Sequence, residues 1–147
     1  MNGLSDRLAE IVDALPLRRG MRVLEIGGAP GAAAKAVAER IGEGGHILVI
    51  DRSDKGITQI HRSAEAEIYA GVMSCRNVAA EDFDLLPDQE PFDLAFAVRV
   101  GALDGRHPRT GAVALKRIAA ALTPDGRLFI DGGDPLQEVD LKPYRRR

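Results

Sequence analysis

The sequence predicts an α/β fold: a doubly wound, mainly parallel sheet of five or six strands with helices on both faces. Short apolar runs alternate along the chain with longer segments whose apolar residues recur at helical spacing. This alternation is typical of a parallel sheet covered by helices. A glycine-rich turn follows the first apolar run, and an aspartate follows the second. Ligands of such folds bind at these strand ends.

The first half of the chain opens with an amphipathic helix that ends at Pro16. Its apolar face consists of Leu4, Leu8, Ile11, Val12 and Leu15. Residues 21–26 form the first strand, and the alanine-rich residues 32–41 form a helix with Pro30 near its first turn and Gly42 at its end. Residues 46–50 form the second strand. Ser53 or Asp54 caps the next helix. The apolar residues of that helix are Ile57, Ile60, Ala64 and Ile68.

The second half continues the alternation. Residues 73–79 form a weaker third strand, and the continuous apolar run 92–98 predicts a central strand covered on both faces. Residues 110–122 form a helix with Thr110 as its cap. Its inward-facing residues are Val113, Ile118 and Leu122. A Pro-Asp-Gly turn at 124–126 leads into the fifth strand at 127–130. Residues 136–141 are the candidate for a sixth strand at the sheet edge.

Composition narrows the class of protein. The 147 residues are enough for one domain, and 45% hydrophobic with 29% charged residues is typical of a globular chain. A formal net charge of −2 argues against nucleic acid as the main ligand. Residues 1–13 lack the apolar core of a signal peptide, and no apolar run approaches the roughly 20 residues of a membrane span. We therefore expect a cytoplasmic protein without membrane contact.

The single cysteine, Cys75, rules out an intramolecular disulfide and favours a reducing compartment. Cys75 itself is expected to be a small buried residue at a strand start. No group of histidine, cysteine and aspartate residues has the spacing of metal ligands. The sequence therefore predicts no metal site.

The turn after the first strand carries the most specific chemistry. Its sequence at 23–31 is Val-Leu-Glu-Ile-Gly-Gly-Ala-Pro-Gly. Counted from Gly27, the later glycines of the dinucleotide pattern Gly-x-Gly-x-x-Gly fall on Ala29 and Ala32, so the pattern is not met. Glu25 would also repel the phosphates of a dinucleotide by roughly a kcal/mol or more. A carboxylate here suits an amino or sulfonium group, which favours S-adenosylmethionine over a nicotinamide dinucleotide. The alternative is a plain strand–turn–helix connection.

The same run resembles motif I of the class I S-adenosylmethionine-dependent methyltransferases, acid-x-Gly-x-Gly-x-Gly. Glu25, Gly27 and Gly31 match, and Ala29 replaces the middle glycine. The resemblance covers residues 20–131 and implies a Rossmann-like fold with S-adenosyl-L-methionine as cofactor. It implies that the methionine part is held by Glu25, Gly27, Gly28, Ala29 and Gly31.

Asp51 ends the second strand, 24 residues after Gly27. An ionised carboxylate there can accept hydrogen bonds from both ribose hydroxyls. The alternative is that Asp51 begins the next helix. Residues 49–53 resemble motif II of the family, and Arg52 would line the adenosine.

Residues 77–83 resemble the segment of the family that meets the adenine ring. The aspartate of that pattern is Ala79 here. The backbone at Ala80 and the side chain of Glu81 are therefore the candidates for adenine contact. A solvated loop after a strand is the alternative.

Residues 91–100 resemble motif IV, whose strand end lies beside the transferred methyl group. The resemblance places Ala97 at the cofactor, whereas Asp93 has a structural role at the far end. Arg99 either pairs with an anion or lies on a solvated rim. In the loop that follows, His107 and Asp104 are the candidates for acid–base chemistry. A surface position for His107 is the alternative.

The predicted organisation is one domain with an N-terminal helix (1–19), a cofactor-binding core (20–131) and a short C-terminal tail (132–147). The family normally adds a helix and an antiparallel strand pair after the fifth strand, so the resemblance implies a short form. A homodimer or a partner protein would cover an open sheet edge. Residues 142–147 are expected to be a solvated tail, with RNA binding as the alternative.

The predicted function is methyl transfer from S-adenosylmethionine to an unidentified acceptor. One alternative is a non-catalytic cofactor-binding module or partner subunit with the same fold. Another is a nucleotide-dependent oxidoreductase, but the position of Glu25 and the unmatched glycine spacing argue against it.

Overall fold

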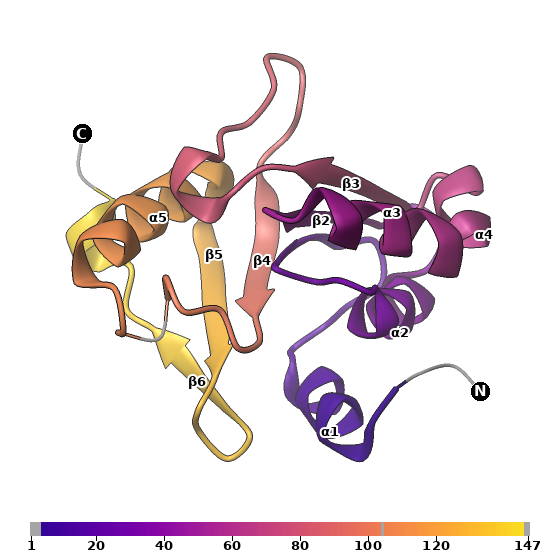
Figure 1. The fold of residues 1–147 in the computed structure, drawn as a ribbon, viewed down its shortest axis with the longest axis horizontal. Coiled ribbons are helices and arrows are strands. Elements are labelled where there is room, and N and C mark those ends of the chain that lie inside the picture. The colour runs from indigo at the N-terminus through magenta and orange to yellow at the C-terminus, as the bar shows by residue number, and fades with distance from the viewer. Residues whose placement is uncertain (1–3, 104, 146–147) are drawn as a thin grey trace.

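A six-stranded sheet with the order β3-β2-β1-β4-β5-β6 organises the chain (Figure 1). The computed structural model describes residues 4–103 and 105–145. Neighbouring strands are parallel except for the last pair, β5 and β6. The strands are β1 (Arg22–Ile26), β2 (His46–Asp51), β3 (Met73–Asn77), β4 (Phe92–Ala97), β5 (Leu122–Asp131) and β6 (Leu136–Val139). The doubly wound α/β class predicted from the sequence is confirmed.

Helices cover both faces of the sheet (Figure 1). The α-helices are α1 (Asp6–Ala14), α2 (Ala32–Ile41), α3 (Asp54–Ser63), α4 (Glu65–Tyr69) and α5 (Pro108–Ala121). Two short 3-10 helices are η1 (Ala80–Asp82) and η2 (Lys142–Tyr144). Alternate strand residues point to opposite faces. Val23, Val49 and Phe96 therefore pack with α1, α2 and α3, whereas their neighbours on the strands pack with α5 and η1.

The chain reverses its direction of winding between β1 and β4. From β1 it builds outward through β2 and β3, and it then returns to place β4 on the other side of β1. At the amino ends of these strands, Arg22 N donates to Asp93 Oδ2 at 2.9 Å. The Arg22 guanidinium also donates to the carbonyls of Glu90 and Pro91. At the opposite ends of the same strands, the switch in winding direction between β1 and β4 leaves the crevice where open α/β sheets bind ligands.

Both serine caps lie where the hydroxyl can accept a helix N–H. Ser5 Oγ accepts from Leu8 N at 3.1 Å, and Ser53 Oγ accepts from Gly56 N at 3.0 Å. The helix predicted after Ser53 is in fact two helices, α3 and α4, which meet at the buried Ala64. Pro30 precedes α2 rather than opening it, since Gly31 is the N-cap.

The predicted start and inner face of α5 were partly wrong. The helix begins at Pro108 with His107 as its N-cap, so Thr110 lies in the first turn. Val113 is 48% exposed and Leu122 begins β5 rather than ending the helix, whereas Ile118 is buried as predicted. Gly111 takes part in the inner face because a Cβ there would lie 2.5 Å from the carbonyl oxygen of Ala102. The inner face of α5 is therefore made mostly of small residues, which allow close packing.

The candidate sixth strand forms over Leu136–Val139, antiparallel to β5. Arg127 and Glu138 pair across the two strands with an N–O distance of 2.8 Å. The outer edge of β5 is therefore paired within the chain. In the described part of the chain, no helix is both long and apolar enough to cross a membrane.

Cys75 differs from its predicted position. It lies in the middle of β3 rather than at its start, and it is half-buried. Its Sγ is 3.4 Å from His61 Nε2. Burial raises the pKa of the Cys75 thiol, so the thiol stays protonated at neutral pH.

Candidate functional site

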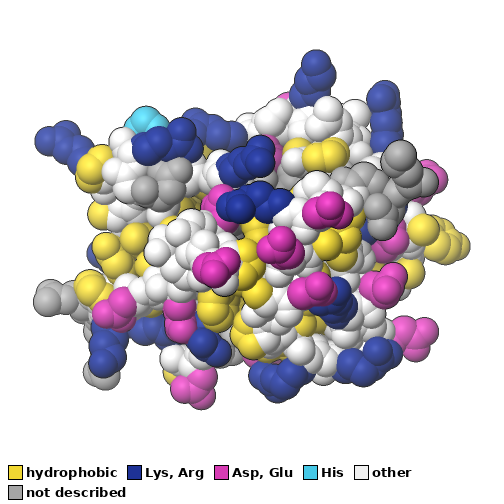
Figure 2. All heavy atoms as spheres, turned by 90° about the horizontal axis from the view of Figure 1, so that it is seen from below, with side chains coloured by type: hydrophobic (Ala, Val, Ile, Leu, Met, Phe, Trp, Pro, Cys, Tyr) yellow, Lys and Arg dark blue, Asp and Glu magenta, His cyan; other side chains and the backbone are white. Residues whose placement is uncertain are grey.

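Two adjoining cavities lie at the carboxyl ends of the central strands. The first, of about 360 Å³, lies between α1, the glycine turn after β1 and the end of β4. The second, of about 560 Å³, lies between the ends of β1 and β2, the segment after β3 and residues 99–110. Gly27 and Arg99 line both cavities. Figure 2 presents this side of the molecule, with basic side chains near the middle of the face and acidic ones beside them.

The glycine turn brings backbone close to both cavities. Gly27 has a φ of +70°, which glycine adopts at no steric cost, and its N–H donates to the Ile50 carbonyl at 2.7 Å. At Gly28, a Cβ would lie 2.6 Å from both Glu25 Cδ and Val49 Cγ1. The missing side chain at Gly28 therefore makes room for the Glu25 carboxyl.

Glu25 is the buried acid of the first cavity. Only 4% of the residue is exposed, and its Oε1 has no hydrogen-bond partner among the described residues. Burial, and secondly the charge of Asp51, raise the pKa of Glu25 to about 8. At neutral pH the carboxyl is therefore mostly protonated. A buried oxygen without a partner costs free energy that a cationic donor in the cavity would offset.

Asp51 links the two strand ends. Its Oδ2 accepts from Ala29 N at 3.1 Å, and its Oδ1 accepts from Ser53 N at 2.9 Å. Asp51 thus ties the glycine turn after β1 to the end of β2. Each carboxylate oxygen can accept a second hydrogen bond. The side chain lines the second cavity, so this capacity is available to a ligand with two neighbouring hydroxyls.

The structure brings most of the sequence-predicted residues to the two cavities. Glu25, Gly28 and Ala29 line the first. The second cavity is lined by four further predicted residues, which are Arg52, Ala80, Glu81 and His107.

Two predicted residues do not line either cavity. Gly31 caps α2 and is not a lining residue, and Ala97 is buried in the core. At the end of β4, the residues that line the cavities are instead Val98, Arg99 and Val100. Asp104 lies outside the described residues.

Sequence reasoning missed the contribution of α1. Ser5, Arg7 and Leu8 line the first cavity. The sequence shows an amphipathic helix there, but its docking on the crevice depends on tertiary packing. No local pattern could therefore have assigned these residues to the site.

A parallel sheet with a switch point, a glycine turn and two strand-end carboxylates defines a Rossmann-like cofactor-binding domain. Residues 23–126 match the family described as a methyltransferase domain. The chain belongs to this family, that of the class I S-adenosylmethionine-dependent methyltransferases.

The chain resembles two curated proteins and a solved structure. It is 29% identical to a protein-L-isoaspartate O-methyltransferase of Methanothrix thermoacetophila over 90% of this chain and 57% of that protein. It is 34% identical to nocamycin O-methyltransferase of Saccharothrix syringae over 95% of this chain and 47% of that protein. An S-adenosylmethionine-dependent methyltransferase from Thiobacillus denitrificans in complex with S-adenosyl-L-homocysteine has a TM-score of 0.65. That match, at 25% identity, covers 88% of this chain and 49% of the other.

The chain thus spans about half the length of the proteins it matches. Family membership and the S-adenosyl-L-homocysteine in the Thiobacillus structure imply S-adenosyl-L-methionine as the cofactor.

Proposed function

We propose that the chain binds S-adenosylmethionine across both cavities and transfers its methyl group to an acceptor. The observation that carries this proposal is the Glu25 carboxyl. It is a buried acceptor that lines a cavity and has no partner among the described residues. The ammonium group of the methionine part is a donor of the kind that this oxygen needs. The adjoining cavity presents Asp51, whose remaining acceptor capacity suits the ribose diol.

When bound, the cofactor supplies a methyl group on a positively charged sulfur, which the lone pair of an acceptor can attack as the carbon–sulfur bond breaks. The protein's main task is then to hold and orient the reactants. Glu25 would hold the ammonium group and Asp51 the ribose, while Ala80 and Glu81 would contact the adenine. His107 lines the second cavity and can accept the proton of the methyl acceptor.

The names of the two curated relatives support oxygen as the methylated atom, because both are O-methyltransferases. A screen of compounds that carry hydroxyl or carboxyl groups would identify the acceptor. Methyl transfer would be followed through the formation of S-adenosylhomocysteine.

Calorimetry with S-adenosylmethionine and S-adenosylhomocysteine tests the binding step. For Asp51→Ala we expect the Kd to rise by tenfold to about a hundredfold, since a hydrogen bond to a charged group contributes about 1.5–3 kcal/mol. Asp51→Asn keeps one acceptor oxygen and should fall between Asp51→Ala and wild type. The matched control is Asp54→Asn, three residues away on α3 and outside both cavities.

The absence of binding heat with either ligand on the wild-type chain would overturn the proposal. Binding without transfer to any compound of the screen would instead support the alternative function, a non-catalytic cofactor-binding module or partner subunit.

A further inference from the structure

Two arginines from distant parts of the chain line the first cavity. Arg7 lies on α1, and Arg99 lies two residues after the end of β4. Asp131, at the end of β5, contacts both. Its Oδ1 accepts from Arg99 N at 3.0 Å, and its Oδ2 is 3.5 Å from the Arg7 guanidinium. This arginine cluster (Arg7, Arg99 and Asp131) therefore joins three elements at the mouth of the crevice.

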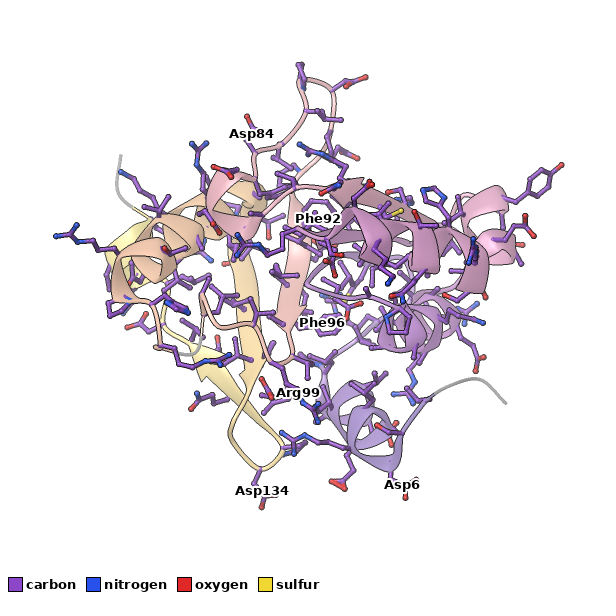
Figure 3. All side chains as sticks on the ribbon, in the orientation of Figure 1. Asp6, Asp84, Phe92, Phe96, Arg99 and Asp134 are labelled. Atoms are coloured by element: carbon purple, nitrogen blue, oxygen red, sulfur yellow. The ribbon has the colours of Figure 1, made fainter. Side chains whose placement is uncertain are left out.

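Arg99 has an unusual backbone. Its φ of +58° lies in the left-handed region, and Arg99 is the one described residue other than glycine with a positive φ. Such a conformation is strained in a residue other than glycine, and strained residues of this kind cluster at functional sites. The hydrogen bond to Asp131 helps to hold it. In Figure 3 Arg99 lies beyond the end of β4, between α1 and the β5–β6 hairpin.

The position of Arg99 differs from that of Arg7. Arg7 lines the first cavity alone, whereas Arg99 lines both. The proposed cofactor spans the two cavities, so its positively charged sulfur would lie where they adjoin. A guanidinium that lies close to another positive charge is repelled by it.

Charge balance around the arginine cluster favours an anion. The Arg7 guanidinium pairs with Asp131, whereas Asp131 meets Arg99 only through the backbone N–H. Among the described residues, the Arg99 guanidinium therefore has no ion-pair partner, and a bound sulfonium would add a further positive charge. An anionic group beside Arg99 would offset both charges, and the planar guanidinium fits carboxylate and phosphate oxygens.

We propose that Arg99 binds an anionic oxygen group, a carboxylate or a phosphate, of the methyl acceptor. Arg99 is thus a specificity-determining residue. This inference rests on the proposed function, because it assumes that the cofactor occupies the two cavities.

The test uses the protein saturated with S-adenosylhomocysteine, with acetate and inorganic phosphate as separate probes at constant ionic strength. The side-chain Nε–H signal of Arg99 and the backbone amide signals of Val98 and Val100 are followed by NMR during each titration, and the two amide signals report probe binding in the Arg99 variants. We expect a saturable shift with at least one probe. Arg99→Gln should abolish binding of that probe, whereas Arg99→Lys, which keeps the charge, should weaken it by less than tenfold. The control is Arg109→Gln, an exposed arginine outside both cavities.

A second measurement separates the acceptor's anion from the cofactor's own carboxylate. Calorimetry compares S-adenosylhomocysteine with methylthioadenosine, which lacks the amino-acid part. We expect Arg99→Gln to change the Kd of each ligand by less than twofold. A loss of tenfold or more for S-adenosylhomocysteine alone would mean that Arg99 holds the cofactor's carboxylate, and it would overturn the inference. A titration in which neither probe shifts the Arg99 signal would overturn it as well.

Failure of the proposed function itself would look different, because wild-type protein would then not bind S-adenosylhomocysteine. The folded state of each variant is checked by its thermal unfolding. Arg99→Lys keeps the inference testable if Arg99→Gln unfolds.

Discussion

Replacing Glu25 with glutamine tests the proposed role of the buried carboxyl. With a pKa of about 8, the carboxyl of the free protein is about nine-tenths protonated at pH 7. The ammonium group of the cofactor would pair with the ionised form, so the proton leaves on binding. We therefore expect wild-type protein to release about 0.9 proton per cofactor bound at pH 7.

The same linkage sets the pH dependence of affinity. As the pH rises, fewer molecules of the free protein have a protonated Glu25 that must lose its proton before the cofactor binds. The Kd should therefore fall about ninefold from pH 6 to pH 7, or about 1.3 kcal/mol. An α-amino group has an ordinary pKa of about 7.7–8.0, so the cofactor's own amine stays mostly charged over this range. Glutamine cannot ionise. The Glu25→Gln variant should therefore release no proton and show a Kd that is independent of pH.

Calorimetry in two buffers that differ in ionisation enthalpy measures the protons released. Glu39→Gln, an exposed change on α2, serves as the matched control and should behave like wild type. The reasoning fails if the wild-type chain binds the cofactor with no proton release and with the same Kd at pH 6 and pH 7. It also fails if Glu25→Gln releases as many protons as wild type.

Three further predictions concern stability. The raised pKa of Glu25 means that its ionisation opposes folding as the pH rises from 4.5 towards 8. The free energy of unfolding of wild type should therefore fall by about 3 kcal/mol relative to Glu25→Gln between pH 4.5 and 7. The same difference in stability between the two proteins at both pH values, measured by urea unfolding, would contradict this. Gly28→Ala should lose about 1–3 kcal/mol, because the new Cβ overlaps Glu25 and Val49, and a wild-type urea midpoint would refute the close packing. Val113→Lys should change stability by less than about 0.5 kcal/mol, whereas Ile118→Ala should cost about 2–5 kcal/mol; similar losses in a thermal scan would refute the assigned face of α5.

The first two strands could be predicted because each is a short apolar run that ends at a residue typical of turns or helix starts, whereas β5 begins at Leu122 and includes the segment 124–126 that the sequence predicts as a turn. The run before Gly27 and the run before Asp51 end as predicted in the structure. The start of α5 was harder, since Thr110 is a good cap by type but Pro108 is better suited to the first helical position.

The site was predictable where it follows directly from a strand end. Glu25 and Asp51 belong to that group, because parallel strands bring their carboxyl ends to one edge of the sheet. The contribution of Arg7 depends on how α1 docks, and that of Arg99 depends on a left-handed turn after β4. Neither feature leaves a local pattern in the sequence. The raised pKa of Glu25 likewise depends on its burial in the folded protein, which the sequence alone does not show.

The reversal between β1 and β4 also divides the sheet into two halves that are continuous in sequence. Residues 22–77 build β1, β2 and β3, and residues 92–139 build β4, β5 and β6. Arg22 joins the two halves at the amino ends of β1 and β4. Its backbone and guanidinium donate hydrogen bonds to residues 90–93, and its guanidinium carbon lies 5.0 Å from the centre of the Phe92 ring. A ligand lying in both cavities would touch the same two halves at the opposite ends. Its binding free energy would then add to the cohesion of the sheet, and amide hydrogen exchange along β1 and β4 should slow when the cavities fill.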